Sequence, residues 1–224
     1  MRSPPHESQE DHMLTGRALL LDMDGTLVDS RAVVERCWSR WAQEKGLDPA
    51  EVLAVAHGRQ GHATMAALLP DRPMEVNLAE NRLLLAQETA DTDGIVPIAG
   101  ALAFLTALDG APHALVTSAD VALSTARMGA AGLPLPAVRV TAEDVRASKP
   151  DPEGFLRGAE LLGVDPADCI VFEDSEAGIA AARAAGMRVV GIGRGAGRFS
   201  PDVQVDDLTG VTVTVDGAGI HLTA

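Results

Sequence analysis

Two aspartates separated by one residue follow a short apolar run near the start of the chain. Asp22 and Asp24 come directly after residues 18–21, which are typical of a buried strand. If the strand continues through residue 23, both carboxylates face one pocket, and two such carboxylates need a proton or a cation between them. A solvated turn explains a bare DxDG pair, but the apolar run before it favours a Mg²⁺ site in which one aspartate is also a nucleophile.

Three more polar features lie at or beyond the ends of predicted strands. Thr117 and Ser118 precede a helix, where a hydroxyl and backbone N–H groups bind phosphate oxygens or simply cap the helix. Lys149 stands in the sequence SKPDP just before another helix, and a solvated surface lysine is the alternative there. Glu173 and Asp174 form a second acidic pair at a strand end, which independent surface turns explain poorly.

Together these groups predict phosphoryl transfer. Four carboxylates alone would repel a phosphate, so a divalent cation and the ammonium group of Lys149 are needed to reverse the local charge. Such a set suits transfer of a phosphoryl group to a carboxylate, followed by attack of water.

The order of the predicted elements indicates how these groups are brought together. A strand over residues 18–23 is followed by helical segments between residues 31 and 89. From residue 113 onward strands and helices alternate, which favours a parallel sheet with crossover helices. The expected strands span residues 113–117, 137–141, 169–173 and 188–191, and the expected helices span residues 119–131, 152–162 and 176–185. Residues 211–223 are predicted to form a terminal hairpin.

We therefore expect an α/β fold, a Rossmann-like parallel sheet core with an inserted all-helical cap domain. Residues 14–30 and 97–224 would form the core, residues 31–96 the cap, and the polar residues 1–13 a disordered tail. The cap would cover the carboxyl ends of the strands, where ligands bind in open α/β sheets. It would act as a mobile lid or pack permanently on the core.

The composition excludes several function classes. The chain has 18 Lys and Arg against 32 Asp and Glu, a formal net charge of −14, which argues against non-specific binding to nucleic acid or to an anionic membrane. No apolar run is long enough for a transmembrane helix, and the first residues lack the apolar segment of a signal peptide. Cys37 and Cys169 lie far apart, so we expect a reduced cytoplasmic setting. The oligomeric state is open, with a monomer as the default.

Four motifs in the order DMDGT, VTS, SKPDP and FEDSEAG closely resemble those of the haloacid dehalogenase-like phosphohydrolases, over residues 14–193. The resemblance implies that Asp22 is the nucleophile and forms an aspartyl-phosphate. It implies that Asp24 protonates the leaving oxygen and then activates water. Thr117 and the amide of Ser118 would hold the transferring phosphoryl group.

The same resemblance implies the roles of the remaining motif residues. Lys149 would neutralise the nucleophile and the phosphoryl oxygens. Mg²⁺ would be bound by Asp22, by the backbone carbonyl of Asp24 and by Asp174. Glu173 would act beside them as a further ligand or through water.

The expected cap is similar to that of phosphatases acting on small sugar and polyol phosphates, such as hexose, deoxyhexose, hexitol or glycerol phosphates. This likeness depends mainly on His57 and Gly58 followed by the basic residue Arg59, which implies that these residues contact the substrate. Some of these enzymes carry the arginine one position later, and a lone histidine in a helical stretch is otherwise structural. We therefore expect a Mg²⁺-dependent phosphatase whose partner is a small phosphorylated sugar or polyol.

Three alternatives share parts of this pattern. A phosphomutase of the β-phosphoglucomutase kind has the same motifs and returns the phosphoryl group to a sugar hydroxyl, and only the cap sequence favours the hydrolase. A dehalogenase would need neither Asp24 nor the metal site at Glu173 and Asp174. A non-catalytic, phosphate-responsive binding protein would be expected to lack the nucleophile or the lysine, and both are present here.

Overall fold

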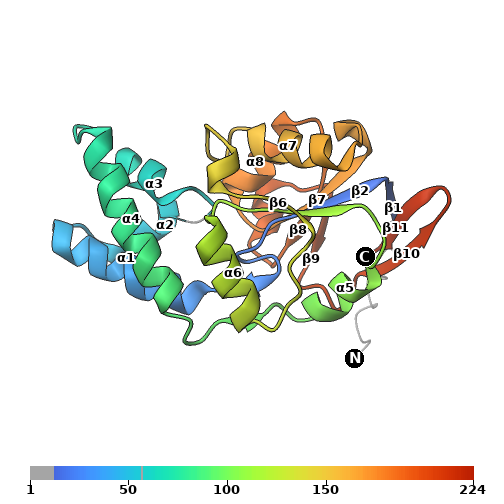
Figure 1. Ribbon diagram of the computed structural model, residues 1–224, viewed down its shortest axis with the longest axis horizontal. Helices are drawn as coiled ribbons and strands as arrows, with labels where there is room; N and C mark the ends of the chain where they lie inside the picture. Colours follow the sequence, from blue (N-terminus) through green and yellow to red (C-terminus); the bar gives the residue numbers. More distant parts are fainter. Residues whose placement is uncertain (1–12, 57) are drawn as a thin grey trace, which may run out of the picture.

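A six-stranded parallel sheet lies at the centre of the computed structural model, which describes residues 13–56 and 58–224 (Figure 1). The strand order is β6-β5-β2-β7-β8-β9. The strands are β2 (Ala18–Leu21), β5 (His113–Val116), β6 (Val138–Val140), β7 (Cys169–Glu173), β8 (Arg188–Ile192) and β9 (Val203–Val205). Every pair of neighbours is parallel, so the carboxyl ends of the strands meet at one edge of the sheet.

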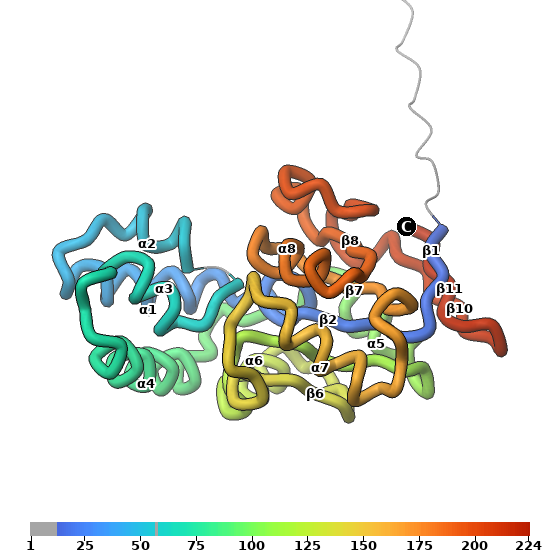
Figure 2. Tube along the Cα trace, turned by 90° about the horizontal axis from the view of Figure 1, so that it is seen from above, coloured from blue at the N-terminus to red at the C-terminus, as the bar shows by residue number. Residues whose placement is uncertain are grey.

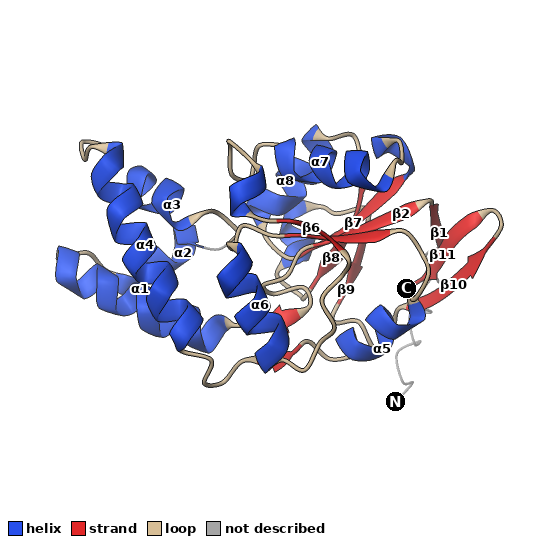
Figure 3. Ribbon diagram, viewed as in Figure 1, coloured by secondary structure: helices blue, strands red, loops and turns tan. Residues whose placement is uncertain are grey.

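Helices cover both faces of this sheet, which makes the molecule three-layered here (Figure 3). The helices are α7 (Glu153–Leu162) and α8 (Glu176–Ala184) on one face, and α5 (Ala101–Ala107) and α6 (Val121–Ala130) on the other. Side chains of β2 alternate between the faces: Leu20 packs in one apolar cluster with Phe155, whereas Leu19 and Leu21 pack in the other with Phe104. Both faces are buried, which explains why β2 is apolar throughout.

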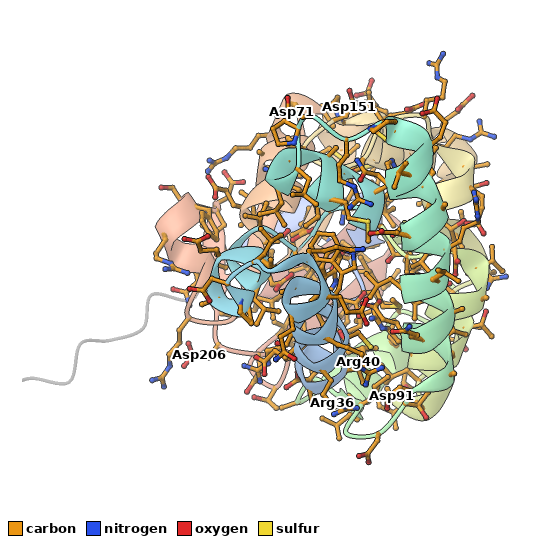
Figure 4. All side chains as sticks on the ribbon, turned by 90° about the vertical axis from the view of Figure 1, so that its left-hand side faces the viewer. Arg36, Arg40, Asp71, Asp91, Asp151 and Asp206 are labelled. Atoms are coloured by element: carbon orange, nitrogen blue, oxygen red, sulfur yellow. The ribbon has the colours of Figure 1, made fainter. Side chains whose placement is uncertain are left out.

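Four further helices form a group at one side of the core (Figure 2). They are α1 (Arg31–Lys45), α2 (Pro49–Ala56), α3 (Gly61–Leu68) and α4 (Met74–Ala90). The chain enters this group through β3 (Val28–Asp29) and leaves it through β4 (Val96–Pro97), and these two short strands pair antiparallel. Arg36 of α1 lies 2.9 Å from Asp91, just beyond α4, which fastens the two long helices together (Figure 4).

A separate three-stranded antiparallel sheet, in the order β1-β11-β10, closes the other side. It contains β1 (Met13–Gly16), β10 (Thr212–Asp216) and β11 (Gly219–Thr223), so the predicted terminal hairpin is confirmed. The tail prediction is wrong at Met13, which is the first residue of β1, because its pairing partner Thr223 lies at the far end of the sequence. Residues 1–12 lie outside the described residues. In the described part of the chain, no helix combines the length and the apolar character needed to cross a membrane.

The end of the first core strand differs from the prediction. Strand β2 ends at Leu21, not at residue 23, because the carbonyl of Met23 accepts hydrogen bonds from the amides of Leu27 and Val28 and closes a tight loop. Asp24 therefore lies in this loop, where it forms an isolated bridge with Val28. The sequence patterns also did not predict α5 and β9, which are short.

Candidate active site

Lys149 lies between two carboxylates at the carboxyl ends of the central strands. Its Nζ is 2.6 Å from Oδ1 of Asp22 and 2.8 Å from Oε1 of Glu173, and it also donates to the carbonyl of Val116. Burial lowers the pKa of the lysine, but the two carboxylates outweigh that effect and raise the pKa above its usual value. Lys149 is therefore a fixed positive charge beneath the site.

Asp22 is held in place by the sheet and by this lysine. Its backbone N–H donates to the carbonyl of Phe172 at 3.0 Å, which continues the pairing of β2 with β7 past the end of the strand. Burial raises the pKa of Asp22 to about 7, Lys149 opposes the rise, and the nearby Glu173 adds to it. Ionising this carboxyl group is therefore costly without further positive charge nearby.

Three carboxylates at this edge of the sheet lie close enough to share a cation. Single carboxylate oxygens of Asp22, Glu173 and Asp174 all lie within 4.8 Å of one another. Gly25 has a φ of 86°, and a Cβ at that position would overlap the carboxylate of Asp174, so glycine is required for this close approach. Burial and the neighbouring carboxylate of Glu173 raise the pKa of Asp174. These hard oxygen donors suit Mg²⁺, and a cation there would relieve their mutual repulsion.

Glu173 is already engaged on both carboxylate oxygens. Oε1 accepts from Lys149, while Oε2 accepts from the backbone N–H of Ser175 at 2.7 Å and from its hydroxyl at 3.0 Å. The side chain is fully buried, and a Cβ at Gly178 would overlap it. Glu173 therefore holds Lys149 and the start of α8 in position, and both of its carboxylate oxygens are engaged in doing so.

Asp24 is also bound by protein donors on both oxygens. The hydroxyl of Ser30 donates to Oδ1 at 2.6 Å, and Nη1 of Arg127 lies 2.7 Å from Oδ2. Asp24 nevertheless lines the same cavity as Asp22, although the strand on which that expectation depended ends at Leu21.

Thr117 and Ser118 follow β5 at the next strand end. The backbone N–H of Thr117 donates to Val140, and its hydroxyl accepts from the amide of Ala119 at 3.1 Å, as a residue before a helix commonly does. The hydroxyl of Ser118 donates to the carbonyl of Gly58 at 3.1 Å. Thr117 thus shapes the end of the strand. Ser118 connects the core with the inserted helices.

The loop between α2 and α3 lies against the core at this point. Gly58 has a φ of 77°, and a Cβ there would overlap the side chain of Ser175, so only glycine fits. Arg59 is half-buried and lines the cavity, and the amide of Gln60 donates to the hydroxyl of Ser148. His57, the other residue predicted to contact the substrate, lies outside the described residues.

A cavity of about 970 Å³ connects these groups. Among the residues that line it are Asp22, Asp24, Thr117, Ser118 and Asp174 from the core and Gly58 and Arg59 from the loop. The volume is at the upper end of the range for small-molecule sites and leaves ample space beyond a phosphate group. The cavity therefore extends from the carboxylate cluster to residues of the inserted helices such as Val34 and Trp38.

Sequence reasoning missed several residues of this site, namely Ser30, Gln60, Asn81, Glu88 and Arg127. Asn81 and Glu88 carried a usable signal, because they recur at helical spacing with Asn77 on the buried face of α4. Arg127 carried none, since an arginine in an amphipathic helix is normally exposed.

Comparisons with known proteins show to which family the chain belongs. A family model described as haloacid dehalogenase-like hydrolase matches residues 17–186. Hexitol phosphatase A of Escherichia coli (strain K12) is 43% identical over 178 residues, which cover 79% of this chain and 82% of that protein. Glycerol-1-phosphate phosphohydrolase 2 of Saccharomyces cerevisiae is 33% identical over 187 residues, covering 78% and 74%. A β-phosphoglucomutase structure from Clostridium difficile matches 86% of this chain and 91% of its own with a TM-score of 0.76 at 21% identity, a likeness of fold.

Proposed function

We propose that this chain, which belongs to the haloacid dehalogenase-like hydrolase family, is a Mg²⁺-dependent phosphatase of small sugar or polyol phosphates. The observation that carries the proposal is the contact of Lys149 with Asp22 at 2.6 Å, beside the carboxylate cluster that includes Asp174. The likeness to hexitol phosphatase A and to glycerol-1-phosphate phosphohydrolase 2 supports the substrate class.

The carboxylates would hold the metal ion. Asp22, Asp174 and the backbone carbonyl of Asp24 would bind Mg²⁺, which supplies the positive charge that a phosphate needs beside these carboxylates. Both oxygens of Glu173 already accept hydrogen bonds from Lys149 and Ser175, which favours action through water rather than direct binding. The raised pKa of Asp22 supports a site built for an additional cation, because burial makes its negative charge costly.

Asp22 and Asp24 would share the chemistry. An oxygen of Asp22 attacks phosphorus, the bond from phosphorus to the ester oxygen breaks, and Asp24 gives a proton to that oxygen so that a neutral alcohol leaves. Water then attacks the phosphorus of the aspartyl-phosphate while Asp24 takes its proton. Inorganic phosphate leaves and the Asp22 carboxylate is restored. Lys149 keeps Asp22 in position, and Thr117 with the amide of Ser118 would hold the phosphoryl oxygens.

Residues 31–96 would act as a cap that encloses the substrate. Gly58 lies against Ser175, and its carbonyl accepts a hydrogen bond from Ser118. These contacts support the role because all three residues line the cavity. Arg59 would contact the substrate from this loop, and a substrate contact by His57 stays a prediction from the sequence.

Phosphate release from a panel of phosphorylated hexitols, hexoses, glycerol and nucleotides, with Mg²⁺ and with EDTA, tests the proposal. We expect Mg²⁺-dependent release concentrated on sugar and polyol phosphates, and none from the Asp22→Asn variant, whose folding is checked by circular dichroism. Conversion of β-glucose 1-phosphate to glucose 6-phosphate without phosphate release would replace the phosphatase with a phosphomutase. Substantial activity of Asp22→Asn would remove Asp22 from the nucleophile role.

A further inference from the structure

Arg127 is a charged residue in the interior of the molecule. It lies on α6, is 3% exposed and contacts two carboxylates. Its Nη1 lies 2.7 Å from Oδ2 of Asp24, and its Nη2 lies 2.8 Å from Oε2 of Glu88. A buried guanidinium group is costly unless carboxylates neutralise its charge. The two carboxylates therefore account for the burial of Arg127.

The carboxyl group of Asp24 is not positioned by the central sheet. Strand β2 ends at Leu21, and Asp24 lies in the loop that follows. Among the described residues, its side chain accepts hydrogen bonds from the hydroxyl of Ser30 at 2.6 Å and from Arg127. Ser30 lies six positions along the chain, whereas Arg127 lies 103 positions away. Arg127 therefore connects the side chain of Asp24 to a helix of the core.

The contact with Arg127 leaves Asp24 able to transfer a proton. The side chain of Asp24 is 30% exposed and lines the cavity that contains Asp22. Each carboxylate oxygen has two lone pairs, so both oxygens keep an acceptor position beyond the bonds from Ser30 and Arg127. The guanidinium group instead fixes the orientation of the carboxyl group. Orientation matters here, because a misplacement of about 1 Å can slow a reaction roughly 10²-fold.

Glu88 holds the guanidinium group of Arg127 from the side of the inserted helices. It lies on α4 and is 5% exposed. In the described part of the chain, Oε2 of Glu88 accepts from Arg127, and Oε1 has no hydrogen-bond partner. A buried carboxylate with a single cationic partner depends on it, because removing that partner leaves an uncompensated charge. Glu88 and Arg127 therefore stabilise each other between the inserted helices and the core.

Helices α4 and α6 pack against each other, and the pair of Glu88 with Arg127 joins them (Figure 1). Helix α4 belongs to the inserted group, whereas α6 belongs to the core. A displacement of α4 from α6 would break the bond from Glu88 and leave the guanidinium group held by Asp24 alone. The position of Asp24 thus depends, through one side chain, on the contact between the two parts.

We propose that Arg127 is a positioning residue of the reaction, an inference that rests on the proposed phosphatase function. It holds the carboxyl group of Asp24 toward the reacting oxygen, and Glu88 keeps the guanidinium group in place from α4. Within the described part of the chain, Arg127 is not among the residues that line the cavity, so it acts through Asp24 and not on the substrate. Asp24 is therefore set for proton transfer only while α4 lies against α6.

Substitution of Arg127 by methionine tests this, since methionine is unbranched and carries no charge. We would measure kcat and KM for phosphate release from a hexitol 6-phosphate at saturating Mg²⁺. The kcat should fall about 10- to 100-fold with little change in KM, because the substrate keeps its contacts while Asp24 loses its orientation. An unchanged kcat, or a loss confined to KM, would overturn the role.

A second substitution at Asp24 separates positioning from general damage to the protein. If Arg127 acts through Asp24, the double variant Asp24→Asn/Arg127→Met should have the kcat of Asp24→Asn alone, because no proton-transferring group remains to be positioned. Losses that multiply in the double variant would show that Arg127 acts independently of Asp24, and the proposal would then be wrong.

Glu88→Gln tests the contribution of the inserted helices. The amide keeps an oxygen for Arg127 but loses the charge, so kcat should fall less than in Arg127→Met, and the fall should vanish in the Asp24→Asn background. A fall that persists there would remove Glu88 from the arrangement. Arg36→Met is the matched control, because Arg36 also pairs with a carboxylate, that of Asp91, but does not contact Asp24. Its kcat should equal that of the unmodified chain, and a fall as large as in Arg127→Met would count against a specific role.

A further variant covers the case in which Arg127→Met does not fold, as judged by circular dichroism. Arg127→Met/Glu88→Gln also removes the carboxylate that would be left unpaired, and it should show the same fall in kcat; an unchanged kcat there would contradict the proposal. If the unmodified chain releases no phosphate from a hexitol 6-phosphate, glycerol phosphate or p-nitrophenyl phosphate, the proposed function itself fails. Release by the unmodified chain that no Arg127 variant slows defeats the positioning role alone.

Discussion

Nη1 of Arg127 lies 2.7 Å from Oδ2 of Asp24, and the same guanidinium group binds Glu88 through Nη2 at 2.8 Å. Arg127 belongs to α6 of the core, whereas Glu88 belongs to α4 of the inserted helices. The guanidinium group is buried, and the side chain of Asp24 is 30% exposed toward the cavity. Arg127 thus links the residue proposed to transfer protons to a carboxylate of the inserted helices.

Replacing Asp24 by asparagine should slow catalysis far more than it weakens binding. The amide keeps an oxygen for Arg127 but cannot give or take the proton, so we expect kcat on polyol phosphates to fall roughly 10²- to 10⁴-fold with little change in KM. On p-nitrophenyl phosphate, whose leaving group needs no proton, only the hydrolysis of the aspartyl-phosphate should be slowed, so the loss should be no larger than on polyol phosphates. Steady-state kinetics on both substrates checks this, and an unchanged rate would assign the proton transfer to another group.

Replacing Lys149 by methionine should damage both stability and activity. The variant leaves the carboxylates of Asp22 and Glu173 facing each other without a buried counter-charge, which we expect to lower the free energy of unfolding by about 3 kcal/mol or more. Urea unfolding in metal-free buffer measures the loss. The double variant that adds Asp22→Asn should recover part of the stability and none of the activity. Equal stabilities of the single and double variants would contradict repulsion as the cause.

Replacing Arg59 by alanine should affect substrates unequally. Arg59 lines the cavity from the loop between α2 and α3, so a contact with the sugar or polyol would be lost while the reacting groups stay in place. We expect kcat/KM on hexitol phosphate to fall about tenfold or more relative to p-nitrophenyl phosphate. Arg40→Ala on α1, outside the cavity lining, is the control (Figure 4). Equal losses on both substrates would remove Arg59 from substrate recognition.

Glu80 should contribute stability that disappears in acid. Partial burial raises its pKa, but hydrogen bonds from Arg72, Lys45 and Trp41 outweigh this and lower the pKa from 4.5 to about 2. A carboxyl group with a lowered folded-state pKa stabilises the protein above pH 4.5, and this contribution is lost as the pH falls toward 2. At pH 7 we expect Glu80→Gln to cost about 1 to 2 kcal/mol, less than the full pKa shift implies, because the charged partners are partly exposed.

Thermal unfolding of both proteins between pH 3 and pH 7 measures the effect of Glu80. The difference between the unmodified chain and Glu80→Gln should shrink as the pH is lowered. Glu160→Gln, which breaks an exposed pair with Arg157, is the control and should change stability by less than about 0.5 kcal/mol. A difference for Glu80→Gln that stays constant with pH would show that packing, not charge, explains it.

The sequence predicted the parts of this fold whose signal is local. Residues 169–173 alternate between the two buried faces of the sheet, and the apolar run before Asp22 marks a central strand with polar groups at its end. Those patterns depend only on residues that are neighbours in the sequence, and the folded structure keeps them. They were enough to predict the parallel core and the terminal hairpin, whereas the place of Lys149 beside Asp22 was implied by the family resemblance.

The remaining parts depend on contacts between distant residues. Strand β1 exists only because Met13 pairs with Thr223, and Arg127 is buried only because Asp24 and Glu88 neutralise it. The sequence around Met13 does not indicate its pairing with Thr223, and the sequence around Arg127 does not indicate its two carboxylate partners. The early end of β2 has the same kind of cause, since the carbonyl of Met23 is taken by residues of the following loop. Asp24 therefore lies in a turn, with partners that the spacing alone did not indicate.

The antiparallel pairing of β3 with β4 has a consequence for how such a protein diversifies. Val28 lies opposite Pro97, so the helical segment begins and ends at one point on the core. A segment joined in this way can be lengthened, shortened or exchanged for another without moving the strands that carry the carboxylates. The helical segment, proposed to enclose the substrate, is therefore separable from the strands that carry the carboxylates, and a chimera joined at these two strands would take each from a different parent.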